Sequence, residues 1–139
     1  DPIWIPPDWH YAEQSYMTGL PVVSVAPGQP YAEGDGSTVE VRDGSVGRVV
    51  DGEFSAYAPG TDIVAGGAVI MPPIASSQRR YKAVLGAHMV EIGGGYAFHG
   101  TNALSTVGTA SSHGCMRMLP EDIERLHDSV ALGDPVFIY

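Results

Sequence analysis

Two Asp-Gly pairs in the first half of the chain constrain its fold more than any other feature of the sequence. Asp43-Gly44 and Asp51-Gly52 interrupt residues 37–58, where valines and aromatic residues alternate with polar ones. Alternation with a period of two is typical of strands with one buried face, and Asp-Gly between such runs is a signal for a tight hairpin. The sequence therefore predicts consecutive short strands joined by hairpins.

The composition agrees with a mainly β fold. The 139 residues include 18 Gly and 11 Pro, which favours many short strands and turns over long helices. Hydrophobic residues make up 44% of the chain, enough for a packed core at this length. We expect one domain over residues 1–139, without repeats or linkers. Further strands are predicted at residues 68–71, within 84–92, at 96–99 and at 135–139.

One clear helix is predicted near the C-terminus, beginning at Pro120. Proline suits the first helical position, and the two acidic residues that follow favour the positive end of the helix dipole. Apolar residues then recur on one face, at Ile123, Leu126 and Val130. Residues 8–17 form a second, short helical stretch, and the rest of the first 36 residues is predicted to be loop and extended chain.

The charge pattern excludes several classes of partner. The formal net charge is −9, so we expect neither nucleic acid nor an anionic membrane surface as a partner. The small basic cluster Arg79, Arg80 and Lys82 is predicted to lie in a solvated loop. No apolar run approaches the roughly 18 residues of a transmembrane helix, and no signal peptide is visible. Because the sequence begins at Asp1 without Met, we expect a mature or trimmed product.

The single cysteine is the strongest chemical signal. Cys115 lies in the run Ser112-His113-Gly114-Cys115-Met116-Arg117. One thiol is too few for a disulfide framework or a cysteine-built zinc site, which leaves a buried small side chain or a nucleophile. The surrounding histidines, glycine and arginine favour the nucleophile. A serine nucleophile at Ser111 or Ser112 is disfavoured, because neither lies in a Gly-x-Ser-x-Gly motif.

A thiol nucleophile needs a nearby imidazole, and two histidines qualify. His113 is two residues from Cys115, so both side chains lie on one face of an extended segment. His99 stands at the end of a predicted strand, and a separate segment can aim its ring at the sulfur, so we rank it first. The N–H groups of Gly114 and Cys115 are candidates for an oxyanion hole. Arg117 suits a substrate carboxylate or a structural acceptor.

These residues together resemble the signature of the L,D-transpeptidase (YkuD) catalytic domain. The resemblance rests on His99-Gly100-Thr101, then Gly108, then Ser112 to Arg117, and it is specific from about residue 83 to 139. It implies an L,D-transpeptidase-like β-sandwich or barrel with one short α-helix near the C-terminus. The family's usual N-terminal strands, with a Thr-Pro-x-Gly-type segment, are not found here. They were removed, lie elsewhere, or are missing from a minimal variant with an exposed sheet edge.

The resemblance also implies an activity and roles for individual residues. Cys115 would attack a peptidoglycan stem peptide, release D-alanine and leave a thioester, which a second stem's amine converts to a 3-3 cross-link. His99 would be the acid and base, oriented by the Gly100 carbonyl, and His113 and Gly114 would complete the catalytic set. The substrate-binding residues would be Arg117, Ser112 and Gly100.

No metal or organic cofactor is implied. Carbapenem-type β-lactams would acylate the thiol. The resemblance places such a protein in the periplasm or the extracellular cell envelope, for cell-wall biogenesis and cell shape.

Two alternatives stay open. A hydrolase on the same scaffold, either an L,D-carboxypeptidase or an endopeptidase, would use water as the acceptor. A non-catalytic cell-wall binding domain would instead keep Cys115 as an inert thiol. The reactivity of the Cys115 thiol distinguishes an enzyme from a binding domain, because a catalytic thiol has a perturbed pKa and is accessible. Whether His113 serves chemistry or holds the loop is likewise open.

Overall fold

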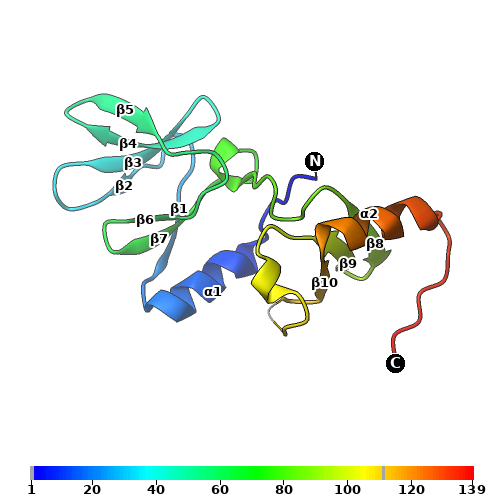
Figure 1. Cartoon of the computed structure of the whole chain (residues 1–139). Coiled ribbons are helices and arrows are strands. Elements are labelled where there is room, and N and C mark those ends of the chain that lie inside the picture. The colour runs from blue at the N-terminus through cyan, green and yellow to red at the C-terminus, as the bar shows by residue number, and fades with distance from the viewer. Residues whose placement is uncertain (1, 111) are drawn as a thin grey trace. The chain divides into compact units, whose positions relative to one another are not determined.

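The structure is a computed structural model that describes residues 2–110 and 112–139 (Figure 1). The chain divides into two compact units. The N-terminal unit comprises Ile5–Tyr81, and the C-terminal unit comprises Lys82–Tyr139 together with residues up to 4. The predicted mainly β fold with a short helix near the C-terminus is confirmed. The single domain over 1–139 stays a prediction. Within the described ranges, no helix has the length and hydrophobicity needed to cross a membrane.

The N-terminal unit contains two sheets. The larger sheet is antiparallel and has the strand order β2-β3-β4-β5, with bounds Tyr31–Ala32, Thr38–Arg42, Ser45–Val50 and Glu53–Ala56. The smaller has the order β1-β7-β6, with bounds Val22–Ser24, Ala68–Met71 and Ile63–Ala65. Helix α1 (Asp8–Thr18) contacts β7, and a short 3-10 helix, η1, spans Ser77–Arg79. The helix predicted over 8–17 is therefore confirmed.

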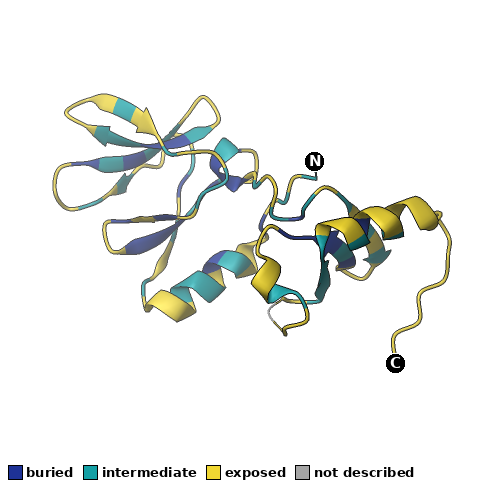
Figure 2. Ribbon diagram, viewed as in Figure 1, coloured by how far each residue is buried: buried dark blue, intermediate teal, exposed yellow. Residues whose placement is uncertain are grey.

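The predicted hairpins form at both Asp-Gly pairs. Asp43 and Asp51 have φ of 48° and 50°, and the glycines that follow them have φ of 73° and 80°. Two consecutive positive φ values are the geometry of a two-residue type I′ turn, which Asp-Gly favours. The turns connect β3 to β4 and β4 to β5. Buried side chains of β3 and β4 form one hydrophobic cluster with side chains of the smaller sheet. The cluster includes Val39, Val46 and Ile70, and Figure 2 shows the buried parts of both sheets in dark blue.

The prediction that Arg79 lies in a solvated loop is wrong. Arg79 is only 3% exposed and donates to the carbonyls of Pro6 and Pro72, at 2.8 and 3.0 Å. It also pairs with Asp8 and lies over the ring of Tyr11, 5.0 Å from its centroid. These carbonyls and the carboxylate replace the water that a guanidinium loses on burial. Arg80 and Lys82 are exposed, as expected.

The C-terminal unit is built on a three-stranded sheet of order β10-β9-β8, with bounds Cys115–Met118, Tyr96–Gly100 and Met89–Gly93. β8 and β9 form an antiparallel hairpin, whereas β9 and β10 run parallel. A 3-10 helix, η2 (Leu104–Thr106), lies in the segment that joins β9 to β10. Helix α2 (Pro120–Ser129) follows β10 and contacts β9, as Figure 1 shows. The helix predicted from Pro120 is confirmed.

Two strand predictions in this unit are corrected. Within 84–92, where a strand pair broken at Gly86 is predicted, only the second strand forms, from Met89, because residues 83–86 make a turn in which Gly86 has φ of 66°. Residues 135–139 form no strand, although their apolar pattern suits one. They are exposed, with Phe137 and Ile138 at 79% and 72%. A short apolar run becomes a strand only where a neighbouring strand exchanges backbone hydrogen bonds with it.

Candidate active site

Parallel pairing of β9 with β10 brings the segment that contains His99 next to the segment that contains Cys115. Cys115 is in register with Ala97, and Arg117 is in register with His99. Residues two apart on a strand share a face, so Cys115, Arg117 and His99 leave the sheet on the same side. Strand rise and spacing place the Cα atoms of Cys115 and His99 about 8 Å apart. An imidazole and a thiol on one face can span such a separation.

His99 is held in one tautomer by its own neighbour. The side chain is 5% exposed, and its Nδ1 lies 2.5 Å from the carbonyl oxygen of Gly100. A carbonyl oxygen only accepts, so Nδ1 carries the proton and donates it. Nε2 of the neutral ring is then left with a lone pair. This nitrogen is the one that can accept a proton from a thiol.

The Gly100 backbone is fixed by close packing on both sides. A Cβ placed on Gly86 would lie 2.6 Å from the Cα of Gly100, so the two backbones touch without side chains between them. A Cβ on Gly100 itself would lie 3.1 Å from Cγ2 of Ile123, which is fully buried on α2. The amide of Gly100 also donates to the carbonyl of His88 at 3.3 Å. These contacts set where the Gly100 carbonyl meets the His99 ring.

Cys115 opens β10 and is partly buried, with a free thiol. The hydroxyl of Ser112 donates to the carbonyl of Cys115, closing the turn before the strand. Gly114 has φ of 113°, a value that side chains disfavour, so glycine is required there. The N–H groups of Gly114 and Cys115, the candidates for an oxyanion hole, thus belong to the end of this turn and the start of β10.

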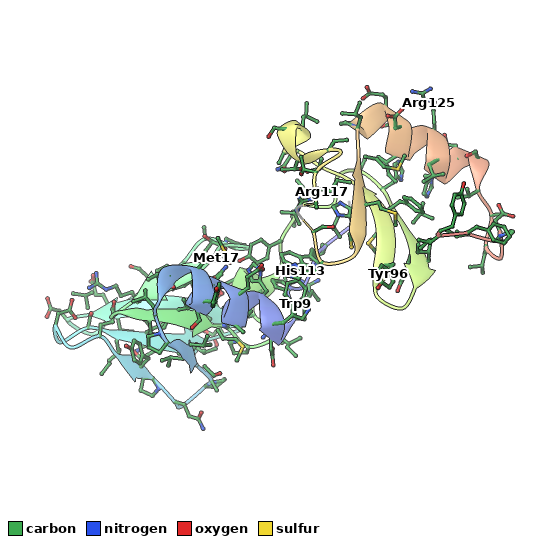
Figure 3. The ribbon with its side chains drawn as sticks, turned by 90° about the horizontal axis from the view of Figure 1, so that it is seen from below. Trp9, Met17, Tyr96, His113, Arg117 and Arg125 are labelled. Atoms are coloured by element: carbon green, nitrogen blue, oxygen red, sulfur yellow. The ribbon has the colours of Figure 1, made fainter. Side chains whose placement is uncertain are left out.

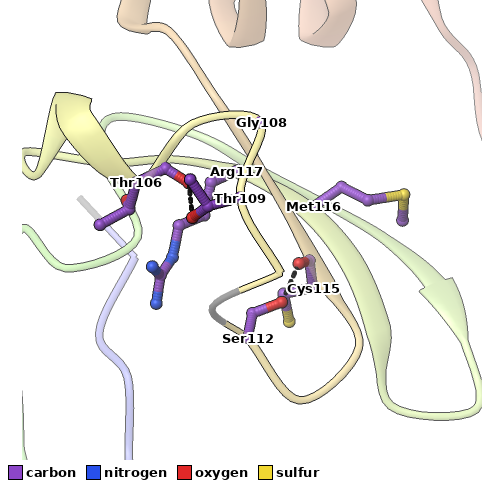
Figure 4. Close-up of a pocket in the computed structure, with 7 residues that line it drawn as sticks. All are labelled: Thr106, Gly108, Thr109, Ser112, Cys115, Met116 and Arg117. Atoms are coloured by element: carbon purple, nitrogen blue, oxygen red, sulfur yellow. Dashed lines mark hydrogen bonds between the residues drawn. The ribbon is translucent and has the colours of Figure 1, made fainter.

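A hollow of about 190 Å³ lies at Cys115 (Figure 4). Sequence reasoning selected three of the residues that line it: Ser112, Cys115 and Arg117. It named Gly108 and Met116 only as parts of the signature, and it missed Thr106 and Thr109. Both threonine hydroxyls donate to backbone carbonyls within the loop, Thr106 to Ala103 at 2.6 Å and Thr109 to Thr106 at 2.8 Å. The lining is mixed in character, because Thr106, Thr109, Ser112 and Arg117 are polar and Met116 is apolar.

The other predicted site residues lie in the same unit. His113 is exposed in the turn before β10, and Figure 3 labels it together with Arg117 and Tyr96. Ser112 is exposed, whereas Gly100 is buried. Ser111 lies outside the described residues.

Two further histidines of the C-terminal unit form a pair of their own. His88 and His127 stack on each other, with ring centroids 4.2 Å apart. Among the residues that the structure describes, no group of three or more His, Cys, Asp or Glu side chains is placed to hold a metal ion.

One known family covers nearly the whole chain. Residues 4–138 match the YkuD family, described as the L,D-transpeptidase catalytic domain. The chain belongs to this family. The YkuD match covers both compact units, so the family assignment applies to nearly the whole sequence. No solved structure matches the chain.

Two curated relatives carry the same description in their names. The probable L,D-transpeptidase YbiS of Escherichia coli K12 is 44% identical over 52 residues, which is 37% of this chain and 17% of YbiS. The probable L,D-transpeptidase ErfK/SrfK of the same strain is 43% identical over 54 residues, 39% of this chain and 17% of ErfK/SrfK. The chain thus matches less than a fifth of the length of these relatives.

Proposed function

We propose that this YkuD chain catalyses cysteine-dependent acyl transfer on peptidoglycan stem peptides, in the periplasm or the extracellular cell envelope. The parallel register of β9 and β10 is the observation that carries the proposal. It places Cys115 and His99 on one face, from segments far apart in the sequence. Family membership and the names of YbiS and ErfK/SrfK support the transpeptidase class.

The first step forms a thioester. The Cys115 thiol gives its proton to Nε2 of His99, and the sulfur attacks the carbonyl carbon that joins the L-centre and D-centre residues. The amides of Gly114 and Cys115 donate to the oxyanion that develops. When the intermediate collapses, the C–N bond breaks. His99 then returns the proton to the departing amine, and D-alanine leaves.

The second step transfers the acyl group to an amine. A side-chain amine of another stem peptide enters, His99 accepts its proton, and nitrogen attacks the thioester carbon. The C–S bond breaks, the proton passes back to sulfur, and a 3-3 cross-link remains. Arg117 lines the hollow at Cys115, where its planar fork suits a carboxylate of the stem peptide.

The proposal is tested with a purified disaccharide-tetrapeptide and with a carbapenem. Wild-type protein is expected to give cross-linked dimers and, with the carbapenem, one covalent adduct in intact-protein mass spectrometry. Cys115→Ala is expected to give neither. Retained cross-linking by Cys115→Ala, or a wild-type protein without any adduct, would contradict the proposal.

The products of the same reaction separate transfer from hydrolysis. Dimers indicate an amine acceptor, whereas tripeptides alone indicate water, as in an L,D-carboxypeptidase. An endopeptidase would instead shorten purified 3-3 dimers. A Cys115 that resists alkylation up to about pH 8.5, the ordinary titration range of a thiol, would favour a binding domain without catalysis.

A further inference from the structure

A tyrosine outside the family signature packs against the glycine that precedes the nucleophile. A Cβ placed on Gly114 would lie 2.9 Å from both Cδ1 and Cε1 of Tyr96, and its third-nearest atom is Cζ of the same ring. A Cβ on Gly94 would lie 3.4 and 3.6 Å from Cδ2 and Cε2, on the opposite edge of the ring. The Tyr96 ring therefore lies between the β8–β9 turn and the turn that leads into Cys115.

Gly114 needs such a contact more than another residue would. Glycine has the greatest backbone freedom of any residue, and Gly114 adopts φ of 113° directly before the nucleophile. An oxyanion hole works through amides that already point at the developing charge, so freedom at this position weakens it. The atoms nearest to its open side all belong to Tyr96. The ring thus limits how far the 114–115 peptide can turn.

The position of Tyr96 in the sheet suits this role. It is the first residue of β9, the strand that also carries His99, and the next residue, Ala97, is in register with Cys115. The ring is held on the strand that carries the proposed base. Because side chains alternate along a strand, Tyr96 leaves the sheet on the opposite face from His99 and Cys115, so its ring supports the Gly114 backbone on the side away from the sulfur. It remains 49% exposed, so its packing on Gly114 does not come from burial in a core.

We propose that Tyr96 is a positioning residue, whose ring holds Gly114 so that the amides of Gly114 and Cys115 face the oxyanion of the acylation step. The inference rests on the proposed acyl transfer at Cys115. It assigns the effect to the ring and not to the hydroxyl, because the three Tyr96 atoms nearest to the Cβ position of Gly114 are all ring carbons.

The central experiment compares two reactions of Cys115. Acylation by the carbapenem needs an oxyanion hole, whereas alkylation by iodoacetamide needs only an accessible thiolate. Tyr96→Ala is expected to slow acylation about tenfold, less than the 100-fold or more seen on removing an oxyanion donor. Alkylation is expected to stay within about twofold of wild type. Tyr96→Phe is expected to match wild type in both reactions.

Three further measurements keep the outcome decisive. Val90→Ala removes apolar bulk from the same hairpin away from Gly114, and should change neither rate. If Tyr96→Ala shows no cooperative thermal unfolding, Tyr96→Leu is used in its place. Amide hydrogen exchange at Gly114 and Cys115, read by NMR, should be faster in Tyr96→Ala even without substrate.

Several results would overturn the inference. In Tyr96→Ala, the acylation and alkylation rates could fall equally, the acylation rate could stay unchanged, or the exchange rates of both amides could stay unchanged. In Tyr96→Phe, the acylation rate could fall as far as in Tyr96→Ala. Failure of the proposed function is recognised separately, as the absence of any Cys115 adduct in wild-type protein. The exchange measurement would still decide whether the ring restrains Gly114.

Discussion

Arg117 lies beside His99 across β10 and β9, and both side chains leave the same face of the sheet. The Arg117 residue also lines the hollow at Cys115. This relationship depends on strand register, so it is a consequence of the fold and not of the short motif alone.

Replacing Arg117 should weaken substrate binding more than thiol chemistry. Arg117→Ala is expected to raise KM for a tetrapeptide donor about tenfold, because a charge-assisted hydrogen bond is lost. Arg117→Lys should recover only part of the loss, since it keeps the charge without the planar fork. Steady-state kinetics with the disaccharide-tetrapeptide measures both. Equal iodoacetamide rates in all three proteins would confirm that Cys115 is undisturbed, and an unchanged KM in Arg117→Ala would contradict the prediction.

Gly86→Ala should destabilise the C-terminal unit and its site together. The new Cβ would lie 2.6 Å from the Cα of Gly100, at a φ of 66°. We expect a loss of about 1–3 kcal/mol in the free energy of unfolding, typical of forced overpacking. We also expect slower acylation, because the Gly100 carbonyl orients His99. Gly19→Ala is the matched control, with φ of 71° and open space around its Cβ. Urea denaturation should show a smaller loss for this control.

Gln78 should be among the most sensitive polar positions in the N-terminal unit. Its side chain is 1% exposed, accepts from the amide of Val46 and donates to the carbonyl of Tyr57, both at 2.7 Å. Gln78→Ala leaves both backbone groups buried without these partners, at an expected cost of about 2–4 kcal/mol. Urea denaturation measures it, with the exposed Gln29→Ala as control. A cost no larger than that of the control would show that water replaces the side chain.

Asp62 should contribute stability that disappears in acid. Burial raises its pKa, but hydrogen bonds from His10, Tyr81 and Gln14 outweigh burial and lower the pKa from 3.8 to about 2. A depressed pKa means that the stabilisation is present above the unfolded value and is lost as pH falls through the folded one. The difference in unfolding free energy between wild type and Asp62→Asn should therefore be constant above about pH 5 and shrink between about pH 4 and 2. A constant difference down to pH 2 would contradict the shift.

Double substitution should reveal the contact between Tyr96 and Gly114. Gly114→Ala alone suffers both the ring clash and the unfavourable φ, whereas in the Tyr96→Ala background only the φ term remains. The loss of stability on Gly114→Ala should thus be smaller in that background, with a coupling of about 0.5–3 kcal/mol. Additive losses in thermal or urea unfolding would show that the ring and the glycine are independent.

Local signals predicted much of the fold. The Asp-Gly turns, the helix from Pro120 and the strand that ends near His99 depend on residues close in sequence, and all appear in the structure. Parallel pairing of β9 with β10 is a long-range property, so the sequence predicted the candidate pair but not its register. Arg79 was mispredicted because its acceptors come from Pro6, Asp8 and Pro72, and residue type alone does not reveal them.

Parallel strands cannot be joined by a tight turn, so the chain must travel back along the sheet between His99 and Cys115. The returning segment includes Thr106, Gly108 and Thr109, which line the hollow at the sulfur. Under the proposed function, the register of β9 and β10 determines which side chains react, and the returning segment determines which substrate fits. A slip of one residue in β10 would turn the thiol to the other face, whereas exchange of side chains in the returning segment would alter which substrate fits. Under that proposal, exchanging the returning segment for that of a relative would change substrate preference and leave Cys115 and His99 in place.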